Sequence, residues 1–406
     1  MTRKILLSSV ASFALCFALP ALAAVGTSTT SDDSATIVQT GETNGIATQN
    51  QPGQWSNTAT ITQSNGNGDT AIQQQNTATW TIPGGGNWAG WGTQVITQSG
   101  NNAASASQTD NSAGSTQTIT QQNNNQSAVT QAINAPDSSN NPNTQTATQS
   151  GTATSTIAQT IGLDPNDKVS TATKNAQTAT QSGQTNATIT QVVDGDTATS
   201  NVQTATETNG GSGNAITQQT LPNGLTNQQT ATISASNSDT LNQNQTGGTS
   251  NVQTASDTSG GSNTVAQTQT GGAGNAQTAT LSAGVFNSVT QTQGNGSGNA
   301  QTATLSSASY NTVDQYQGIG GSNVQIASLS SSSNGLVVQR QDNGSGGSQT
   351  ATQTNTGGSN QIGQYQGNSY DVASVTQTGG SGNLAIQNQG GAYFSANGSS
   401  LSPKHN

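Results

Sequence analysis

Between residues 239 and 353, side chains of two kinds alternate along the chain, and the alternation restarts every twelve residues. Two kinds of segment take turns, one reading N-x-V-x-Q-x-Q and the other N-x-Q-x-A-x-L, so the full repeat is 24 residues long. Internal repeats of this length are typical of solenoids, in which each repeat forms one turn. The leading asparagines are Asn251, Asn263, Asn275, Asn287, Asn299, Asn311 and Asn323.

The spacing of two within each segment predicts a β-strand, because successive side chains of a strand point to opposite faces. The Asn, Gln, Val, Ala and Leu of the pattern then share one face, while the intervening Thr, Ser and Ala share the other. Glycine-rich clusters such as residues 270–274 separate the segments and favour tight turns. The fold class predicted is therefore all-β, an amyloid-like β-solenoid of strand-turn-strand rungs of about 24 residues.

A single rung of two short strands buries too little to offset an ordering cost of about 1.5 kcal/mol per residue. Stacked rungs align identical residues at about 4.8 Å, so glutamine over glutamine and asparagine over asparagine can hydrogen-bond along the stack. We expect these inward amides to form a structural ladder. The predicted ladder residues are Asn251, Asn263, Gln267, Gln269, Asn275, Gln277, Asn287, Gln291, Gln293, Asn299, Gln301, Asn311, Gln315, Gln317, Asn323, Gln325, Gln339, Gln341 and Gln349.

Looser matches to the pattern extend the predicted solenoid to residues 57–391. Residues 24–56 are polar and lack the repeat, which predicts a flexible leader, and residues 392–406 are predicted to be a C-terminal tail. Four tryptophans cluster early in the chain, where we expect them to cover the first rungs, with contact to a nucleator or a surface sugar as the alternative. They are Trp55, Trp80, Trp88 and Trp91.

The composition excludes an ordinary globular core, since only 28% of residues are hydrophobic, 5% are charged and 3% are aromatic. Such a chain is either disordered or ordered by backbone pairing and side-chain ladders. The strict periodicity favours the ordered alternative.

Residues 1–23 have the three parts of a secretory signal: Arg3 and Lys4, an apolar run, and the small-residue ending Ala21-Leu22-Ala23. The apolar run is too short for a comfortable membrane span, so none is predicted in the mature chain. The one cysteine, Cys16, falls within this segment. No disulfide is therefore expected to stabilise the mature protein.

Charge and residue types exclude two further classes of function. The formal net charge is −10 and the few cations are scattered, which argues against nucleic-acid binding. The sole histidine is His405, and no nucleophile–base pair or His/Cys metal cluster can be built, so neither catalysis nor a cofactor is expected. Isolated charged residues such as Asp257, Asp314 and Arg340 are interpreted as residues that maintain solubility or limit aggregation.

Gln377, Gly379, Asn383, Ala385 and Gln389 follow a repeat of the form S-x5-Q-x-G-x2-N-x-A-x3-Q, with one extra residue in the turn. In this respect residues 57–391 resemble the curlin family, the secreted subunits of curli amyloid fibres. The chain departs from the family by using Asn or Asp where curlins prefer Ser, and by its variable turns. A second match comprises Gln98, Gly100, Asn102, Ala104 and Gln108.

The resemblance implies an extracellular fibre at the bacterial cell surface, built by self-polymerisation, with a role in biofilm matrix and adhesion. It implies two partners, a nucleator subunit and an outer-membrane secretion pore. The polar leader at residues 24–56 would be similar to the family's secretion-targeting segment.

Three other functions stay open at this point: a monomeric ice-binding solenoid, a monomeric adhesin, and a disordered matrix polymer. The T-x-T spacing at Thr278/Thr280 and Thr302/Thr304 is the arrangement seen in some ice-binding proteins. Threonine also suits strands in general, and residues such as Ser256 interrupt the outward rank.

Overall fold

The computed structural model describes residues 24–28, 34–51, 57–75, 80–81, 87–88, 92–112, 114–134, 142–162, 174–194, 198–342, 344–390, 394–397 and 400–403. The predicted signal peptide at residues 1–23, Trp55 and Trp91 lie outside these ranges. Within them every regular element is a β-strand, as the sequence predicts. The chain divides into two compact units, Met1–Asn201 (unit 1) and Val202–Asn406 (unit 2).

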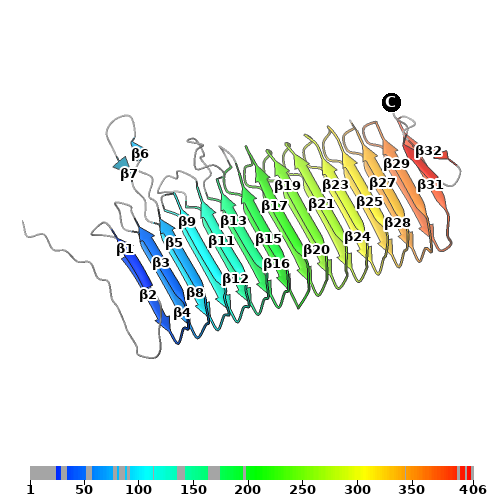
Figure 1. The fold of residues 1–406 in the computed structure, drawn as a ribbon. Coiled ribbons are helices and arrows are strands. Elements are labelled where there is room, and N and C mark those ends of the chain that lie inside the picture. The colour runs from blue at the N-terminus through cyan, green and yellow to red at the C-terminus, as the bar shows by residue number, and fades with distance from the viewer. Residues whose placement is uncertain are drawn as a thin grey trace, which may run out of the picture. The chain divides into compact units, whose positions relative to one another are not determined.

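In each unit consecutive strands alternate between two parallel sheets, called sheet A and sheet B (Figure 1). Sheet A of unit 1 contains β1 (Ala24–Ser28), β3 (Ile46–Gln51), β5 (Thr70–Gln75), β9 (Ser105–Asp110), β11 (Ala128–Ile133), β13 (Thr156–Ile161) and β15 (Thr188–Val193). Sheet B of unit 1 contains β2 (Ser34–Thr40), β4 (Thr58–Ser64), β8 (Thr93–Ser99), β10 (Thr116–Gln122), β12 (Thr144–Ser150) and β14 (Ala176–Ser182). A short antiparallel pair, β6 (Trp80–Thr81) and β7 (Asn87–Trp88), lies outside both sheets.

Unit 2 repeats the arrangement. Its sheet A contains β17 (Ala215–Leu221), β19 (Thr240–Thr246), β21 (Thr264–Thr270), β23 (Ser288–Gln293), β25 (Thr312–Gln317), β27 (Leu336–Gln341), β29 (Gln361–Gln366) and β31 (Leu384–Gln389). Its sheet B contains β16 (Val202–Thr208), β18 (Gln228–Ser234), β20 (Val252–Thr258), β22 (Ala276–Ser282), β24 (Ala300–Ser306), β26 (Val324–Ser330), β28 (Ser348–Thr354) and β30 (Val372–Thr378). An antiparallel hairpin, β32 (Phe394–Asn397) and β33 (Ser400–Pro403), follows.

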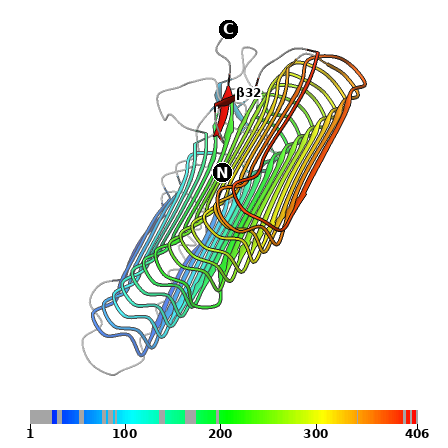
Figure 2. The same cartoon turned by 90° about the vertical axis from the view of Figure 1, so that its right-hand side faces the viewer.

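Neighbouring strands of a sheet pair residues that are one sequence repeat apart. In sheet B of unit 2, Gln277 pairs with Gln301 and Gln301 with Gln325, so equivalent residues 24 apart lie side by side. The two sheets face each other to form a flattened tube of stacked turns (Figure 2). The predicted β-solenoid with rungs of about 24 residues is confirmed.

The stacked repeat begins earlier than residue 57. Strands β2 and β3 lie within the segment expected as a polar leader, and they pair in parallel with β4 and β5. The reason is visible in Ala35, Ile37 and Gln39, which align with Ala59, Ile61 and Gln63. The boundary of the leader is therefore corrected for residues 34–51.

The interior is narrow and contains amide columns beside columns of aliphatic side chains. In unit 1, Ile61, Ile96 and Ile119 stack along sheet B and are fully buried. In unit 2, Leu281 and Leu305 form the corresponding column at 1% exposure. Alternate residues of each strand therefore point inward, as the period of two requires.

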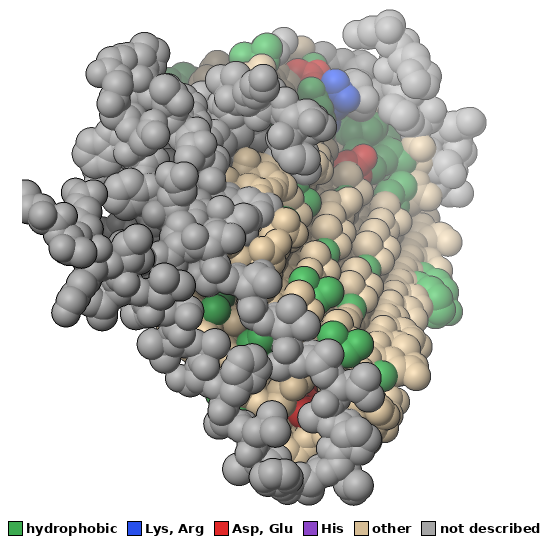
Figure 3. Space-filling model, turned by 60° about the vertical axis from the view of Figure 1, so that its left-hand side comes forward, with side chains coloured by type: hydrophobic (Ala, Val, Ile, Leu, Met, Phe, Trp, Pro, Cys, Tyr) green, Lys and Arg blue, Asp and Glu red, His purple; other side chains and the backbone are tan. Residues whose placement is uncertain are grey.

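Turns between rungs stack as closely as the strands do. A Cβ atom added to Gly296 would lie 1.9 Å from the backbone oxygen of Gly320 in the next rung. No side chain fits there without moving that backbone. On the face shown in Figure 3, uncharged side chains run in parallel rows, and few charged side chains interrupt them.

Connections on the two sides of unit 1 differ in length. Each connection from sheet B to sheet A spans five residues, from 41–45 after β2 to 183–187 after β14. Connections from sheet A to sheet B vary, as between Gln75 and Thr93 or between Ile161 and Ala176. Length variation is therefore confined to one side of the unit's tube.

The predicted tail contains the β32–β33 hairpin, which packs on the outer face of sheet A. Gly363 points outward from β29, and a Cβ atom placed on it would meet the side chains of Leu401 and Phe394. The backbone nitrogen of Leu401 donates to the side-chain oxygen Oε1 of Gln361 at 2.6 Å. In Figure 2, β32 lies beside the tube. The described part of the tail therefore covers a flank of the sheet.

Candidate functional site

The central feature of unit 2 is an unbroken column of glutamines inside sheet A. Each side-chain nitrogen Nε2 donates to the oxygen Oε1 of the glutamine one rung further, at 2.7–2.8 Å. The column runs from β17 to β29. Its members are Gln218, Gln243, Gln267, Gln291, Gln315, Gln339 and Gln364.

The second N–H of each of these amides crosses the tube. Nε2 of Gln267 also donates to the backbone oxygen of Thr254 in sheet B, at 3.0 Å, and Nε2 of Gln291 donates to that of Thr278 at 3.0 Å. A primary amide has two donor hydrogens, and here both have acceptors. One set of bonds joins the rungs, and the other joins the two sheets.

Two further glutamine columns follow the same rule. In sheet A, Gln245 donates to Gln269 at 2.9 Å and Gln269 to Gln293 at 2.8 Å. In sheet B, Gln277 donates to Gln301 and Gln301 to Gln325, both at 2.9 Å. All these residues are 0–1% exposed.

The asparagines have a different part in the structure. Oδ1 of Asn275 accepts the backbone N–H of Asn299 at 3.0 Å, and Nδ2 of Asn275 donates to the turn oxygen of Gly296 at 2.8 Å. Each asparagine therefore satisfies the backbone of the following rung where a strand begins. Direct amide-to-amide bonds also occur, as between Asn287 and Asn263 at 3.1 Å.

The structure places all the predicted ladder residues inside unit 2, each at most 3% exposed. It adds equivalent columns in unit 1, where the irregular spacing of the repeats hid them. There Gln108 donates to Gln131 at 2.9 Å, Gln131 to Gln159 at 2.7 Å, and Gln159 to Gln191 at 2.7 Å. The sequence feature that could have predicted these columns is the glutamine that recurs near the end of each strand.

Acidic residues occupy some positions of the inward-facing columns. The sequence pattern was not used to predict these buried acids. Asp257 is fully buried between Ile233 and Leu281, so its interpretation as a residue that maintains solubility is wrong. Burial, and then the charge of Asp239, raise the pKa of Asp257 to about 7. Asp239 is itself fully buried at an asparagine position, where Oδ1 accepts the backbone N–H of Asn263 at 2.8 Å, and burial raises its pKa.

Unit 1 contains buried acids of the same kind. Burial, and then the charge of Asp69, raise the pKa of Glu42 to about 6. Burial also raises the pKa of Asp110 to about 6, although hydrogen bonds from Ser112 act in the opposite direction.

In unit 2, the strict period could have revealed that Asp257 is buried, because that residue occupies the place of Leu281 one rung earlier.

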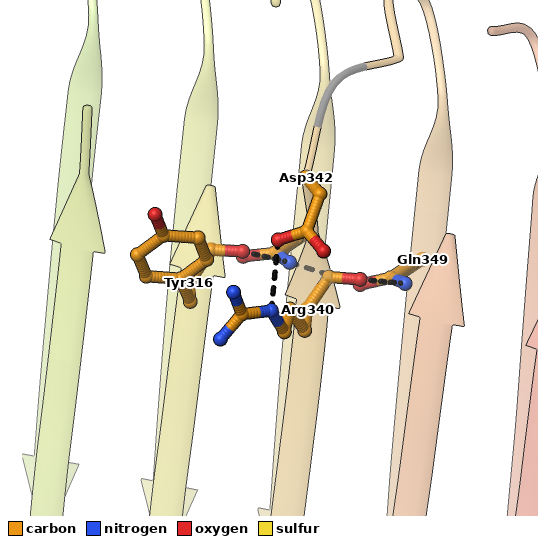
Figure 4. A network of polar contacts seen from close by, with 5 residues as sticks. Tyr316, Arg340, Asp342 and Gln349 are labelled. Carbon is orange, nitrogen blue, oxygen red and sulfur yellow. Dashed lines mark hydrogen bonds and ion pairs between the residues drawn. The ribbon is translucent and has the colours of Figure 1, made fainter. Parts of the chain in front are cut away.

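Asp314 and Arg340 do lie on the outer face, on sheet A of unit 2. Nε of Arg340 donates to Oδ1 of Asp342 at 2.8 Å, and the guanidinium carbon lies 4.5 Å from the ring centre of Tyr316 (Figure 4). Burial raises the pKa of Asp314, and Arg340 partly offsets that effect. Asp314, Tyr316 and Arg340 line the space beside Phe394 and Leu401 of the hairpin.

The last rung of unit 2 has an open edge. β30 and β31 stand at the ends of their sheets, and all six residues of β31 are partly exposed, including the inward Gln387 and Gln389. Their equivalents Gln364 and Gln366 in β29 are 0–1% exposed. Strand edges of this kind present unpaired backbone groups and can template further pairing.

The first and last rungs have matching inner faces. Inward residues of β30 and β31 read Ala373, Val375 and Gln377, then Ala385, Gln387 and Gln389. Inward residues of β2 and β3 read Ala35, Ile37 and Gln39, then Ala47, Gln49 and Gln51. Rungs in the middle of unit 2 differ, with Gln301, Ala303 and Leu305 on β24. The second rung shares the pattern, with Ala59, Ile61 and Gln63 on β4. The last rung of unit 2 therefore resembles the first two rungs of unit 1 more than it resembles the middle of its own unit.

No protein-family model matches the sequence, and no curated protein is significantly similar to it. In the described ranges no helix is long and apolar enough to cross a membrane. Among these residues there is also no group of three or more His, Cys, Asp or Glu side chains placed to hold a metal ion. The class that the fold defines is a parallel two-sheet β-solenoid with buried amide columns.

Replacing Gln291 by Met should destabilise unit 2, because the variant keeps the volume but loses every hydrogen bond of the amide. Gln267 then lacks an acceptor, and Gln315 and the backbone oxygen of Thr278 lack a donor. Buried groups left unsatisfied cost about 1–3 kcal/mol each. Urea unfolding followed by circular dichroism measures the loss. The matched control, Gln219→Met on the outer face of β17, should be close to neutral.

Replacing Asp257 by Leu should stabilise the protein above pH 7 and reduce its pH dependence. The folded state raises the pKa of Asp257 from 3.8 to about 7. The wild type is thus relatively more stable below pH 4 and loses that contribution as pH rises through 7, by about 4 kcal/mol at most. Ser256→Leu, at the neighbouring outward position of the same strand, is the control, because it adds the same side chain and removes no titratable group. Equal pH profiles for wild type and Asp257→Leu would contradict this assignment.

Proposed function

We propose that this protein is a secreted structural subunit that assembles end to end into curli-like amyloid fibres outside the bacterial cell. The observation that carries the proposal is the match between the inner faces of the last and first rungs, which differ only in Val375 for Ile37. Placing β2 and β3 of one copy on β30 and β31 of another sets Ala35 on Ala373, Ile37 on Val375 and Gln39 on Gln377. The aliphatic and amide columns then continue across the junction.

The hydrogen bonds within one chain favour the same end-to-end addition of a second copy. Inside unit 2 each new rung completes the hydrogen bonds of the glutamines below it, at 2.7–2.8 Å. The half-exposed amides of β31 lack that completion. A second copy supplies it together with a row of backbone hydrogen bonds, which is the arrangement of cross-β fibres.

One segment opposes this junction. β1 pairs with β3, placing Gly26 beside Gln49 and Ser28 beside Gln51. Neither Gly26 nor Ser28 has an amide that continues the ladder. Addition of a second copy in the matched register requires β3 to exchange β1 for β31, so β1 acts as a removable cover.

The resemblance to curlins supplies the biological setting of the proposal. It brings export by the signal at residues 1–23, passage through an outer-membrane pore, and a nucleator subunit that starts the fibre. The fibre then serves biofilm matrix and adhesion. A disordered matrix polymer is the less supported alternative, since such a chain has no use for a phase-locked amide column.

The purified mature chain should form fibres after a lag, with dye binding and a diffraction reflection at about 4.8 Å along the fibre axis. Val375→Lys should arrest growth on wild-type seeds after about one added layer, because a charge at the inner face of the junction stays unpaired. The control is Thr376→Lys, whose side chain points outward from the same strand.

A wild-type chain that stays a soluble, folded monomer at high concentration would refute end-to-end assembly. Equal growth of Val375→Lys and Thr376→Lys would place the junction elsewhere. A random-coil spectrum that never converts to sheet would favour the disordered polymer.

Removing residues 24–28 from the mature chain should speed the elongation of wild-type seeds, because β3 then has no competing strand. The measurement is the initial rate of dye fluorescence at fixed seed concentration. As a control, replacing residues 24–28 by alternating residues of equal β propensity should leave the rate near that of wild type. A slower rate for the shortened chain would instead make β1 part of the junction.

A further inference from the structure

The outer face of sheet B carries hydroxyl side chains in regular ranks. In unit 2, the third residue of the strands is threonine in β16, β18, β20, β22, β24 and β28. The fifth residue is threonine or serine in every strand of this sheet, including Thr280 and Thr304. Direct register pairs join them across strands, as Thr278 with Thr302 and Thr280 with Thr304. Sheet B of unit 1 repeats the ranks, as in Thr146 with Thr178.

This face is uncharged along all the strands of sheet B. The protein has a formal charge of −10 and 16 acidic residues, yet none of them points outward from these strands. In unit 2 the outer face of sheet A is different, since it carries Asp314, Arg340 and Tyr316. The separation of the two chemistries between the two faces indicates a binding role for sheet B.

We propose that the outer face of sheet B binds the surface of crystalline water. Parallel strands place equivalent threonines about 4.8 Å apart across the sheet and about 6.6 Å apart along each strand. Water oxygens in ice planes also repeat in two directions, and one of these spacings is close to the distance between neighbouring strands. Hydroxyls on such a lattice can replace lattice water, and the threonine methyl groups between them order the water that remains.

The charge and shape of the face favour this ligand over others. A neutral array complements a neutral lattice, whereas an anionic or cationic partner would need opposite charges that the face lacks. Sheet B also presents no outward aromatic side chain in the described ranges, whereas binding of sugar rings generally uses such groups. The inward columns keep the sheet's backbone fixed, so the hydroxyls are held in place before binding.

In unit 2 the threonine ranks are interrupted by Ser256, Ser328, Ser374 and Ile326. The three serines keep the hydroxyl and lose only the methyl group. Ile326 keeps a branched apolar side chain of the same backbone register. The interruptions therefore leave the lattice spacing intact.

The test compares freshly purified full-length mature chain with two double variants in ice recrystallisation and in partition into a slowly growing ice hemisphere. Thr280→Tyr with Thr304→Tyr places two bulky rings on sheet B. Thr268→Tyr with Thr292→Tyr does the same on sheet A of the same two rungs. The wild type and the sheet A variant should enter the ice and suppress recrystallisation, and the sheet B variant should lose both activities.

Circular dichroism and urea unfolding establish that both variants keep the fold, and Thr280→Ser with Thr304→Ser offers a milder change that should weaken ice binding in part. Exclusion of the wild type from ice overturns the proposal, as does equal activity of the two tyrosine variants. Loss of lateral fibre bundling in the sheet B variant, without ice activity in the wild type, would assign this face to a second copy of the chain. The two ice readouts do not depend on fibre growth, so a failed fibre assay leaves the test of ice binding intact.

Discussion

Everything in this structure depends on one constraint: a buried primary amide must find partners for two donors and an acceptor. In each unit the interior is too narrow and too poor in apolar groups to gain its stability from packing alone. Gln267, Gln291 and their equivalents meet the constraint by bonding both to the next rung and to the facing sheet. Because every amide needs an equivalent above and below, the register of the strands cannot drift where the columns run, even where the repeats differ in length, as between Gln131, Gln159 and Gln191.

The period of the sequence was enough to predict the strands, their inward faces and the 24-residue rung of unit 2. It also placed the ladder residues, since Gln315 or Asn299 can occupy only one face of a strand whose register is set by identical neighbours. The period could not show that the asparagines and the glutamines of the ladder make different hydrogen bonds. That Asn275 bonds the backbone of Asn299, and a turn oxygen, depends on the path of the chain at the strand start.

Two other features escaped sequence reasoning for different reasons. Composition made residues 34–51 look like a leader, although Ala35, Ile37 and Gln39 hold the same inner positions as the next rung. Charge made Asp257 look like a surface residue, although its phase puts it inside. In both cases position in the period was more informative than residue type. The fate of the tail depended on Phe394 and Leu401 meeting Gly363, a contact that no local pattern encodes.

The unequal lengths of the connections in unit 1 have a practical consequence. Turns from sheet B to sheet A are uniform, because asparagine or serine bonds tie each to its neighbour, as Ser127 does with Thr152. Turns in the opposite direction differ in length by many residues without altering the register of the strands they join. Foreign peptides inserted into these longer connections would therefore lie along one side of the unit at multiples of the rung spacing. The chain would hold such inserted peptides at fixed distances from one another.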